Sequence, residues 1–181
     1  MSASLVGSEM CIRDRSKIIE LVRQTKPLIF QEMTHEKVTE KGAADYVTNV
    51  DVAVQKYLKE ALGNEFPDIA LIAEEKENLG LDPDKSYWIL DPIDGTTNLI
   101  RDYHLSAVSL GLYENGEITF GVVYNPFTEE LFYGAKGEGA YLNGAPIQVS
   151  DQPEFKDAVV SFGSSPYEKN RAKELFPIFY N

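Results

Sequence analysis

Two stretches near the start of the chain place apolar residues at the spacing of a helix. The first runs from about Ser16 to Ile29, and Pro27 predicts a kink or an early end within it. Residues 35–44 are polar and contain glycine, which is typical of a loop. A second helix is predicted to stop at Gly63, and its apolar face is made of Val50, Val54, Tyr57, Leu58, Ala61 and Leu62.

Beyond the second helix the pattern changes to short apolar runs. These runs predict strands at residues 69–73, 87–90, 105–113, 118–124, 131–135 and 141–149. Two Asn-Gly pairs, Asn115-Gly116 and Asn143-Gly144, are typical of two-residue hairpin turns. Two helices followed by a mostly antiparallel meander predict an α+β fold, with the helices covering one face of a sheet.

Composition and charge narrow the classes of function. The 29 acidic residues exceed the 17 Lys and Arg, and the net charge of −12 disfavours binding to nucleic acid. No apolar run approaches the roughly 20 residues that would span a bilayer, so no membrane association is expected. An anionic substrate would need a positive group in its site, for which a bound cation is the simplest source.

The two ends of the sequence carry separate expectations. Residues 1–14 have neither the charged start nor the apolar centre of a signal peptide, and resemble translated adapter sequence. The alternative is a native but disordered leader. The only cysteine, Cys11, lies there, so an intramolecular disulfide is impossible, which fits the cytoplasm. We expect a metal-binding α+β lobe over residues 15–156, and at 157–181 the start of a second α/β lobe with a helix at 168–179.

The strongest chemical signal is a pair of carboxylates at the end of a predicted strand. Asp91 and Asp94 converge if Pro92 and Gly95 turn the chain between them. The backbone N–H groups from Gly95 to Thr97 would then open a short helix and face a phosphate. The alternative without any chemistry is that Asp91 caps a strand and that Asp94 belongs to an ordinary turn.

A second acidic pair, Glu74-Glu75, ends the predicted strand at residues 69–73, which we expect to be a neighbour in the sheet. Two carboxylates about 4 Å apart repel by roughly 4 kcal/mol at an effective dielectric near 20. Four of them converging at strand ends would therefore need cations. Hard oxygen ligands of this kind suit Mg²⁺.

One run of eight residues carries a family resemblance: Asp91-Pro92-Ile93-Asp94-Gly95-Thr96-Thr97-Asn98. With Glu74-Glu75 before it, this run resembles the signature of the inositol monophosphatase family. The likeness extends from Lys41 to Ser150, and it implies the layered αβαβα fold of that family. Complete members continue for roughly another 80 residues, which include a further Asp for the second metal, so the chain is expected to be truncated and at best a weak phosphatase.

The resemblance implies the metal ligands. Glu74, Asp91 and the backbone carbonyl of Ile93 would hold the first Mg²⁺. Asp91 would bridge to a second Mg²⁺, which Asp94 also binds. Glu75 would support the metal-binding Glu74, although on the residues alone it reads equally well as a solvated surface charge. Two or three Mg²⁺ ions are implied, with Mn²⁺ as a substitute.

The resemblance also implies the catalytic and substrate-binding groups. Asp51 and Thr96 would orient the attacking water, and with Glu74 they form the catalytic set. Asp51 alone could be no more than the partner of Thr48 in a helix cap. Asp94 and residues 95–97 would bind the phosphate. Lys41 would lie near the site, with a plain surface lysine as the alternative.

The function implied is Mg²⁺-dependent hydrolysis of a small phosphate monoester by metal-activated water. Inositol monophosphate is the expected substrate, with a sugar bisphosphatase or nucleotide 3′-phosphatase activity as the enzyme alternative. A non-catalytic role in binding another protein is the third reading. The resemblance further implies inhibition by Li⁺ and a homodimer for the full-length protein.

Overall fold

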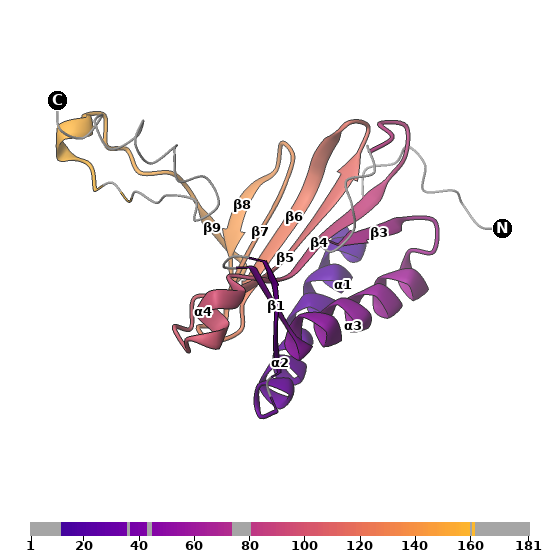
Figure 1. Ribbon diagram of the computed structural model, residues 1–181. Helices are drawn as coiled ribbons and strands as arrows, with labels where there is room; N and C mark the ends of the chain where they lie inside the picture. Colours follow the sequence, from indigo (N-terminus) through magenta and orange to yellow (C-terminus); the bar gives the residue numbers. More distant parts are fainter. Residues whose placement is uncertain (1–11, 36, 43–44, 74–80, 160, 162–181) are drawn as a thin grey trace.

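A computed structural model describes residues 12–35, 37–42, 45–73, 81–159 and 161 (Figure 1). The three longer helices lie against one face of a seven-stranded sheet, and a two-stranded hairpin stands beside it. The helices are α1 (Ile12–Arg23), α2 (Thr25–Met33), α3 (Asn49–Glu65) and the short α4 (Thr96–Ile100). The strands are β1 (Val38–Gly42), β2 (Asp45–Thr48), β3 (Ala70–Ala73), β4 (Tyr87–Asp94), β5 (Ala107–Glu114), β6 (Glu117–Asn125), β7 (Glu130–Ala135), β8 (Gly139–Leu142) and β9 (Ala145–Ile147).

The first predicted helix is two helices. The break falls at Gln24, between α1 and α2, and not at Pro27. Pro27 lies in the first turn of α2, where a missing N–H costs nothing because those donors have no partner within the helix. Helix α1 also begins at Ile12, so it includes residues 12–14 of the expected leader.

The sequence predicts the start and the apolar face of helix α3 but not its end. Thr48 caps its start in a reciprocal capping box with Asp51. Of its predicted apolar face, Val50, Val54, Leu58 and Leu62 are buried, and Tyr57 and Ala61 are partly buried against the core. Gly63 does not stop the helix, which continues to Glu65. Phe66 ends it, because Pro67 disfavours helical geometry at the residue before it and the Phe66 ring packs edge-on against Trp88 at 5.5 Å.

The sheet is a meander with one parallel pair. Its strand order is β3-β4-β5-β6-β7-β8-β9, so from β4 onwards each strand pairs antiparallel with the next one in the chain. The predicted adjacency of the strand at 69–73 and the strand that starts at Tyr87 is confirmed, since β3 and β4 pair in parallel. Their carboxyl ends therefore lie at the same edge of the sheet.

Both Asn-Gly pairs form the predicted tight turns. Asn115 and Gly116 have φ of 51° and 86°, and Asn143 and Gly144 have φ of 50° and 87°. Two successive residues with positive φ are typical of the type I′ turn, whose twist matches that of the flanking strands. The register of β5 with β6 and of β8 with β9 follows from these turns.

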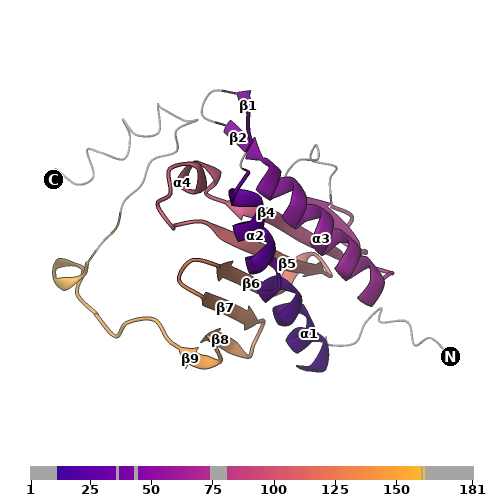
Figure 2. The same ribbon diagram turned by 90° about the horizontal axis from the view of Figure 1, so that it is seen from below.

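The polar segment predicted as a loop contains a hairpin. Strands β1 and β2 pair antiparallel and stand apart from the main sheet (Figure 2). The prediction failed because residues 38–48 contain no run of apolar residues in their sequence, which is the signal that sequence patterns report. Strand β2 leads directly into α3, and so the hairpin fixes where that helix begins.

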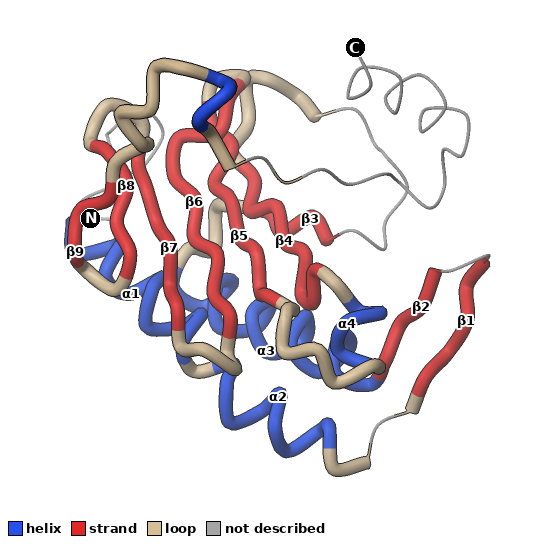
Figure 3. The backbone as a smooth tube through the Cα atoms, turned by 90° about the vertical axis from the view of Figure 1, so that its left-hand side faces the viewer, coloured by secondary structure: helices blue, strands red, loops and turns tan. Residues whose placement is uncertain are grey.

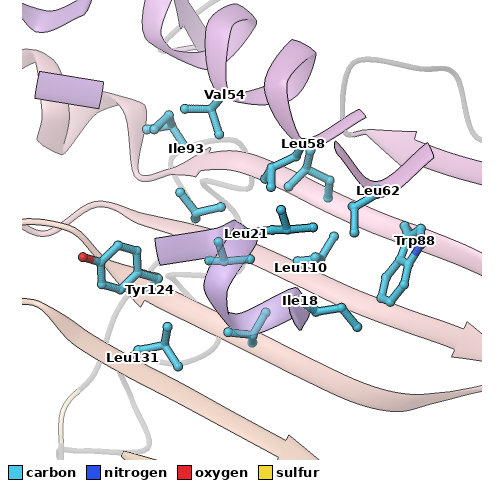
Figure 4. Packing of buried hydrophobic residues seen from close by; sticks show 14 of the residues in the cluster. Ile18, Leu21, Val54, Leu58, Leu62, Trp88, Ile93, Leu110, Tyr124 and Leu131 are labelled. Atoms are coloured by element: carbon cyan, nitrogen blue, oxygen red, sulfur yellow. The ribbon is translucent and has the colours of Figure 1, made fainter. Parts of the chain in front are cut away.

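The hydrophobic core lies between the helices and one face of the sheet (Figure 4). Every second residue of the central strands points into it and is at most 4% exposed, namely Trp88, Leu90, Val108, Leu110, Leu112, Phe120, Val122, Tyr124 and Leu131. Helices α1 and α3 supply the opposing side chains, among them Ile18, Leu58 and Leu62. We call this side of the sheet the covered face.

The opposite side, which we call the open face, is not covered by α1, α2 or α3 (Figure 3). It holds a groove of about 440 Å³ whose walls include Ile89, Ile118, Val123 and Phe132. After β9 the chain continues through a 3-10 turn at Phe155–Asp157. The predicted helix at 168–179 lies outside the described residues, and no described helix is long and apolar enough to cross a membrane.

Candidate metal and phosphate site

A bulge in β4 brings the two aspartates of the signature together. Asp91 pairs with Ser109 and Asp94 pairs with Ala107, so three residues of β4 advance against two of β5. In a regular strand, residues three apart would point to opposite faces. The extra residue cancels that difference, and Asp91 and Asp94 both line hollows on the open face that share Val123 and Phe132.

This corrects the mechanism predicted for their convergence. Pro92 does not turn the chain; it is buried within β4, at the bulge. A proline is tolerated there because a bulged residue has no ladder partner for the N–H that proline lacks. The two carboxylates are brought to one face by register, and only the exit from the strand at Gly95 is a turn.

Ile93 connects these carboxylates to the next element. Its N–H donates to Asp91 Oδ1 at 3.1 Å, and its side chain is 3% exposed. Its carbonyl oxygen lies 3.1 Å from the Thr96 hydroxyl, which donates to it. The backbone oxygen predicted as a metal ligand is therefore held in place by a buried side chain on one side and by Thr96 on the other.

Asp51 occupies the start of α3 and is 6% exposed. Its Oδ2 accepts from the Thr48 backbone N–H at 2.8 Å and from the Thr48 hydroxyl at 2.6 Å. Its Oδ1 lies 3.3 Å from the Thr96 hydroxyl, which comes from a segment 45 residues further along the chain. The helix cap and the predicted pairing with Thr96 are both present, one on each carboxylate oxygen.

Burial raises the pKa of Asp51 above its ordinary value, and this effect outweighs the hydrogen bonds from Thr48 and Thr96, which act in the opposite direction. The carboxylate is therefore short of solvation and well suited to accept a further donor. One Thr96 proton is shared between Asp51 and the Ile93 carbonyl, so a change at either oxygen affects the other.

Gly95 makes the turn from β4 into α4. It has φ of 84°, a region that favours glycine, and an added Cβ would lie 3.0 Å from the Leu105 carbonyl oxygen. Helix α4 begins at the next residue, as predicted from the Gly-Thr-Thr sequence. Thr97 lies exposed in its first turn, and Asp94 is exposed just before the turn.

The remaining predicted residues are placed only in part. Lys41 belongs to β1. Glu74 and Glu75 lie outside the described residues; Glu74 follows Ala73, the last residue of β3, which pairs with Leu90. Among residues 12–35, 37–42, 45–73, 81–159 and 161, no three His, Cys, Asp or Glu side chains gather as a metal site would require.

The described oxygen donors fit a hard divalent cation. Asp91 and Asp94 offer carboxylates on one face, and Ile93 offers a backbone carbonyl between them in the chain. All three are oxygen ligands, which Mg²⁺ prefers.

Three residues near the site were not predicted to support it. Thr48 was expected only to cap α3, yet its hydroxyl also holds Asp51. Asn98 closes the Gly95 turn by donating to the Leu105 carbonyl at 2.9 Å. Ser106, which falls within the strand predicted at 105–113, lies just before β5 and donates to the Gly95 carbonyl at 2.9 Å. No local spacing signal could have paired residues 95 and 106.

The inositol monophosphatase family model matches residues 12–177 of the chain. The chain is 39% identical over 134 residues to a fructose-1,6-bisphosphatase/inositol-1-monophosphatase of Aquifex aeolicus, covering 74% of this chain and 50% of that protein. It is 45% identical over 141 residues to an inositol-1-monophosphatase of Synechocystis, covering 77% and 48%. It is 35% identical over 135 residues to a Nus factor SuhB of Xylella fastidiosa, covering 75% and 48%.

Solved structures are similar over the same part of the chain. An IMPase/NADP phosphatase complexed with NADP and Ca²⁺ has a TM-score of 0.75 at 29% identity, covering 83% of this chain and 59% of that one. The same kind of enzyme complexed with Mg²⁺ and phosphate has a TM-score of 0.68 at 31%, covering 74% and 52%. A LiCl-soaked inhibitory complex of a staphylococcal inositol monophosphatase has a TM-score of 0.70 at 30%, covering 78% and 55%. The chain thus spans about half the length of the relatives it matches.

Proposed function

The chain belongs to the inositol monophosphatase family, and from that premise we propose that the protein hydrolyses a small phosphate monoester with Mg²⁺, inositol monophosphate being the first substrate to test. The observation that carries the proposal is the bulge in β4. It aligns Asp91 and Asp94 on one face, beside the Asp51–Thr96 pair. A structural role alone would not require two exposed or half-buried carboxylates next to a buried carboxylate–hydroxyl pair.

We assign the metal ligands as Asp91, Asp94 and the Ile93 carbonyl, with Glu74 as a further ligand and Glu75 as its support. Bound Mg²⁺ would lower the pKa of a coordinated water and neutralise charge on the phosphoryl oxygens. The similar enzyme complexed with Mg²⁺ and phosphate supports this choice of cation. Two ions, or three, are proposed on the family pattern, with Mn²⁺ able to replace them.

The chain's own groups would orient the attacking water. Thr48 holds Asp51 through two hydrogen bonds, so the carboxylate has little freedom to rotate. When the Thr96 hydroxyl donates its hydrogen bond to Asp51, its oxygen lone pairs remain free to accept a hydrogen bond from the water. The water's oxygen would then face the phosphorus, which is the positional part of catalysis. The amides of residues 95–97 and Asp94 would bind the phosphate and its ester.

Two other functions are compatible with the same site. The similarity to an IMPase/NADP phosphatase and to a bisphosphatase of Aquifex aeolicus supports a nucleotide or sugar phosphate substrate. The similarity to a Nus factor supports a role in protein binding.

The absence of a possible intramolecular disulfide fits the cytoplasm, where we place the protein. Li⁺ is proposed to inhibit in competition with Mg²⁺, as the staphylococcal inhibitory complex suggests.

The test is a calorimetric titration of Mg²⁺ into the wild-type chain and into Asp91→Asn, followed by a hydrolysis assay. We expect Asp91→Asn to weaken Mg²⁺ binding by at least about tenfold, because it removes a ligand, not merely a group that supports one. The assay compares inositol monophosphate, fructose 1,6-bisphosphate and NADP. The family's activity is absent if none of the three is hydrolysed faster in Mg²⁺ than in EDTA.

Asp68→Asn is the matched control. It removes the same charge from an exposed residue before β3, at the other end of the sheet. Its Mg²⁺ affinity should equal that of the wild type within about twofold, since an exposed charge far from the site is screened by salt. Equal losses in the two variants would mean that net charge, and not ligation, governs binding, and the assignment of Asp91 would be wrong.

A further inference from the structure

The carbonyl oxygen of Gly95 accepts three hydrogen bonds. Two come from the start of α4 itself, from the backbone N–H of Asn98 at 2.8 Å and of Leu99 at 3.1 Å. The third comes from the Ser106 hydroxyl at 2.9 Å. Ser106 is 2% exposed, so its hydroxyl has no access to bulk water as an alternative partner. This bond ties the turn after β4 to the segment that enters β5.

The other side of the same turn is also closed. Asn98 donates its side-chain amide to the Leu105 carbonyl at 2.9 Å. A Cβ on Gly95 would lie 3.0 Å from that carbonyl and 3.1 Å from the Asn98 amide nitrogen, so the backbone at residue 95 passes close to both groups and a larger residue would displace one of them. Residues 98, 105 and 106 therefore determine together where the Gly95 peptide lies.

Gly95 stands directly between Asp94 and Thr96, so its position determines where the Thr96 hydroxyl points. The distances of 3.3 Å to Asp51 Oδ1 and 3.1 Å to the Ile93 carbonyl lie at the long end of the hydrogen-bonding range. A displacement of a few tenths of an ångström at residue 95 would break the first contact. Asp51 cannot follow, because Thr48 holds its other oxygen.

We propose that Ser106 is a positioning residue for the Asp51–Thr96 pair, acting through the Gly95 carbonyl. The proposal rests on the function proposed above, in which that pair orients the attacking water. Ser106 touches neither substrate nor metal in this scheme. Its contribution is to hold the Gly95 turn in the one geometry that keeps Thr96 within reach of Asp51.

The experiment compares Ser106→Ala with the wild type, first without ligand. Amide hydrogen exchange at Asn98 and Leu99 is measured by NMR, together with the three-bond couplings that report the Thr96 side-chain rotamer. Loss of one buried hydrogen bond should raise exchange at the two amides about fivefold. The Thr96 couplings should change from those of one rotamer to an average over several. Unchanged couplings would overturn the proposal.

The control is Thr25→Val, which removes another buried hydroxyl that donates to a carbonyl, that of Val22 at 2.7 Å in the helix layer. It should destabilise the protein to a similar degree and leave the exchange at Asn98, the exchange at Leu99 and the Thr96 couplings as in the wild type. Ser106→Cys keeps a side chain of similar size with a weaker hydrogen-bond donor. Its exchange rates and Thr96 couplings should lie between those of the wild type and those of Ser106→Ala. It also serves if Ser106→Ala does not fold.

The second stage is turnover of a phosphate monoester in saturating Mg²⁺. Ser106→Ala should lower kcat about tenfold and leave KM and the Mg²⁺ affinity within about twofold, because only the orientation of the water is affected. A fall in kcat no larger than that of Thr25→Val would overturn the role in catalysis. A wild-type chain without turnover would overturn the proposed function, and the Thr96 couplings would still decide whether Ser106 positions Thr96.

Discussion

The covered and open faces of the sheet are built from the same strands and differ in almost every other respect. On the covered face, alternate residues such as Leu110 and Val122 are at most 2% exposed and meet helices α1 and α3. On the open face, alternate positions hold glycine, serine, Asp91 and half-exposed apolar residues, for example Val123 at 40%. The covered face is filled with close-packed apolar side chains. The open face holds a groove and carries the carboxylates of the candidate site.

This difference separates stability from chemistry. Burial of large apolar side chains supplies most of the free energy of folding, and it is concentrated on the covered face. A metal and a phosphate need oxygen ligands with access to solvent, and these lie at the end of β4 on the open face. Helix α3 contributes to both, since its buried side supplies the core while its first turn supplies Asp51.

The largest effect should come from breaking the covered face. Leu110→Ala removes a fully buried side chain at the centre of the sheet and should lower the free energy of unfolding by about 3 kcal/mol. Val123→Ala, on the next strand but on the open face, should cost less than about 1 kcal/mol. Urea unfolding followed by the fluorescence of Trp88, the only tryptophan, measures both. Equal costs would mean that the open face is also packed in solution.

An intermediate effect is expected where the two faces meet, at the Gly95 turn. Gly95→Ala should lower the free energy of unfolding by about 1–3 kcal/mol, from a strained backbone and a contact with the Leu105 carbonyl. Gly116→Ala has a similar φ of 86° with no atom nearer than 4.0 Å, so it isolates the backbone strain. The difference between the two variants measures the crowding at the site, and the same cost in both would rule that crowding out.

A smaller effect should appear as a pH dependence of the buried carboxylate. The pKa of Asp51 is raised by burial, so the folded state holds its proton more tightly than the unfolded chain does. Its contribution to stability is therefore full below the ordinary pKa near 3.8 and is lost as the pH rises through the raised value. Without metal, the wild type should lose stability relative to Asp51→Asn as the pH rises from about 4. A constant difference between the two would contradict the raised pKa.

The smallest effect is expected for the exposed ion pairs that join helices to strand turns. Lys26 pairs with Glu129, and the pair lies largely in solvent. Glu129→Gln should leave the urea midpoint unchanged within error at 0.15 M salt, since screening and side-chain entropy offset the attraction. A clear loss of stability would mean that the helices depend on charge as well as on the covered face for their attachment to the sheet.

Most of the fold was open to prediction because it depends on local patterns. The apolar face of α3, the two Asn-Gly turns and the adjacency of β3 and β4 each follow from spacing or turn chemistry within a few residues. The hairpin of β1 and β2 was missed because its sequence contains no apolar run. The break at Gln24 was placed three residues late because Pro27 is tolerated in the first turn of a helix.

Some features of the candidate site could likewise be predicted from local sequence, and others could not. The residue types and the order of Asp91, Ile93, Asp94 and Thr96 were evident from the family signature, and the pairing of Thr96 with Asp51 is present in the structure. The bulge that aligns the aspartates was not evident, because register depends on the partner strand and not on β4 alone. The role of Ser106 was hidden for a similar reason, since its partner is a backbone carbonyl eleven residues earlier.

The strand order of the sheet has a consequence for how the molecule assembles. From β4 to β9 each pairing joins neighbours along the chain, so the loops that must close are short and their entropic cost is low. We expect these hairpins to form early in folding, whereas the docking of α1 and α3 must wait for contacts between distant segments. Asp51 arrives with α3, and Thr96 belongs to the meander. The pair that would orient the attacking water is therefore completed only when the helices close over the sheet, so that catalytic competence would appear at the end of folding and not before.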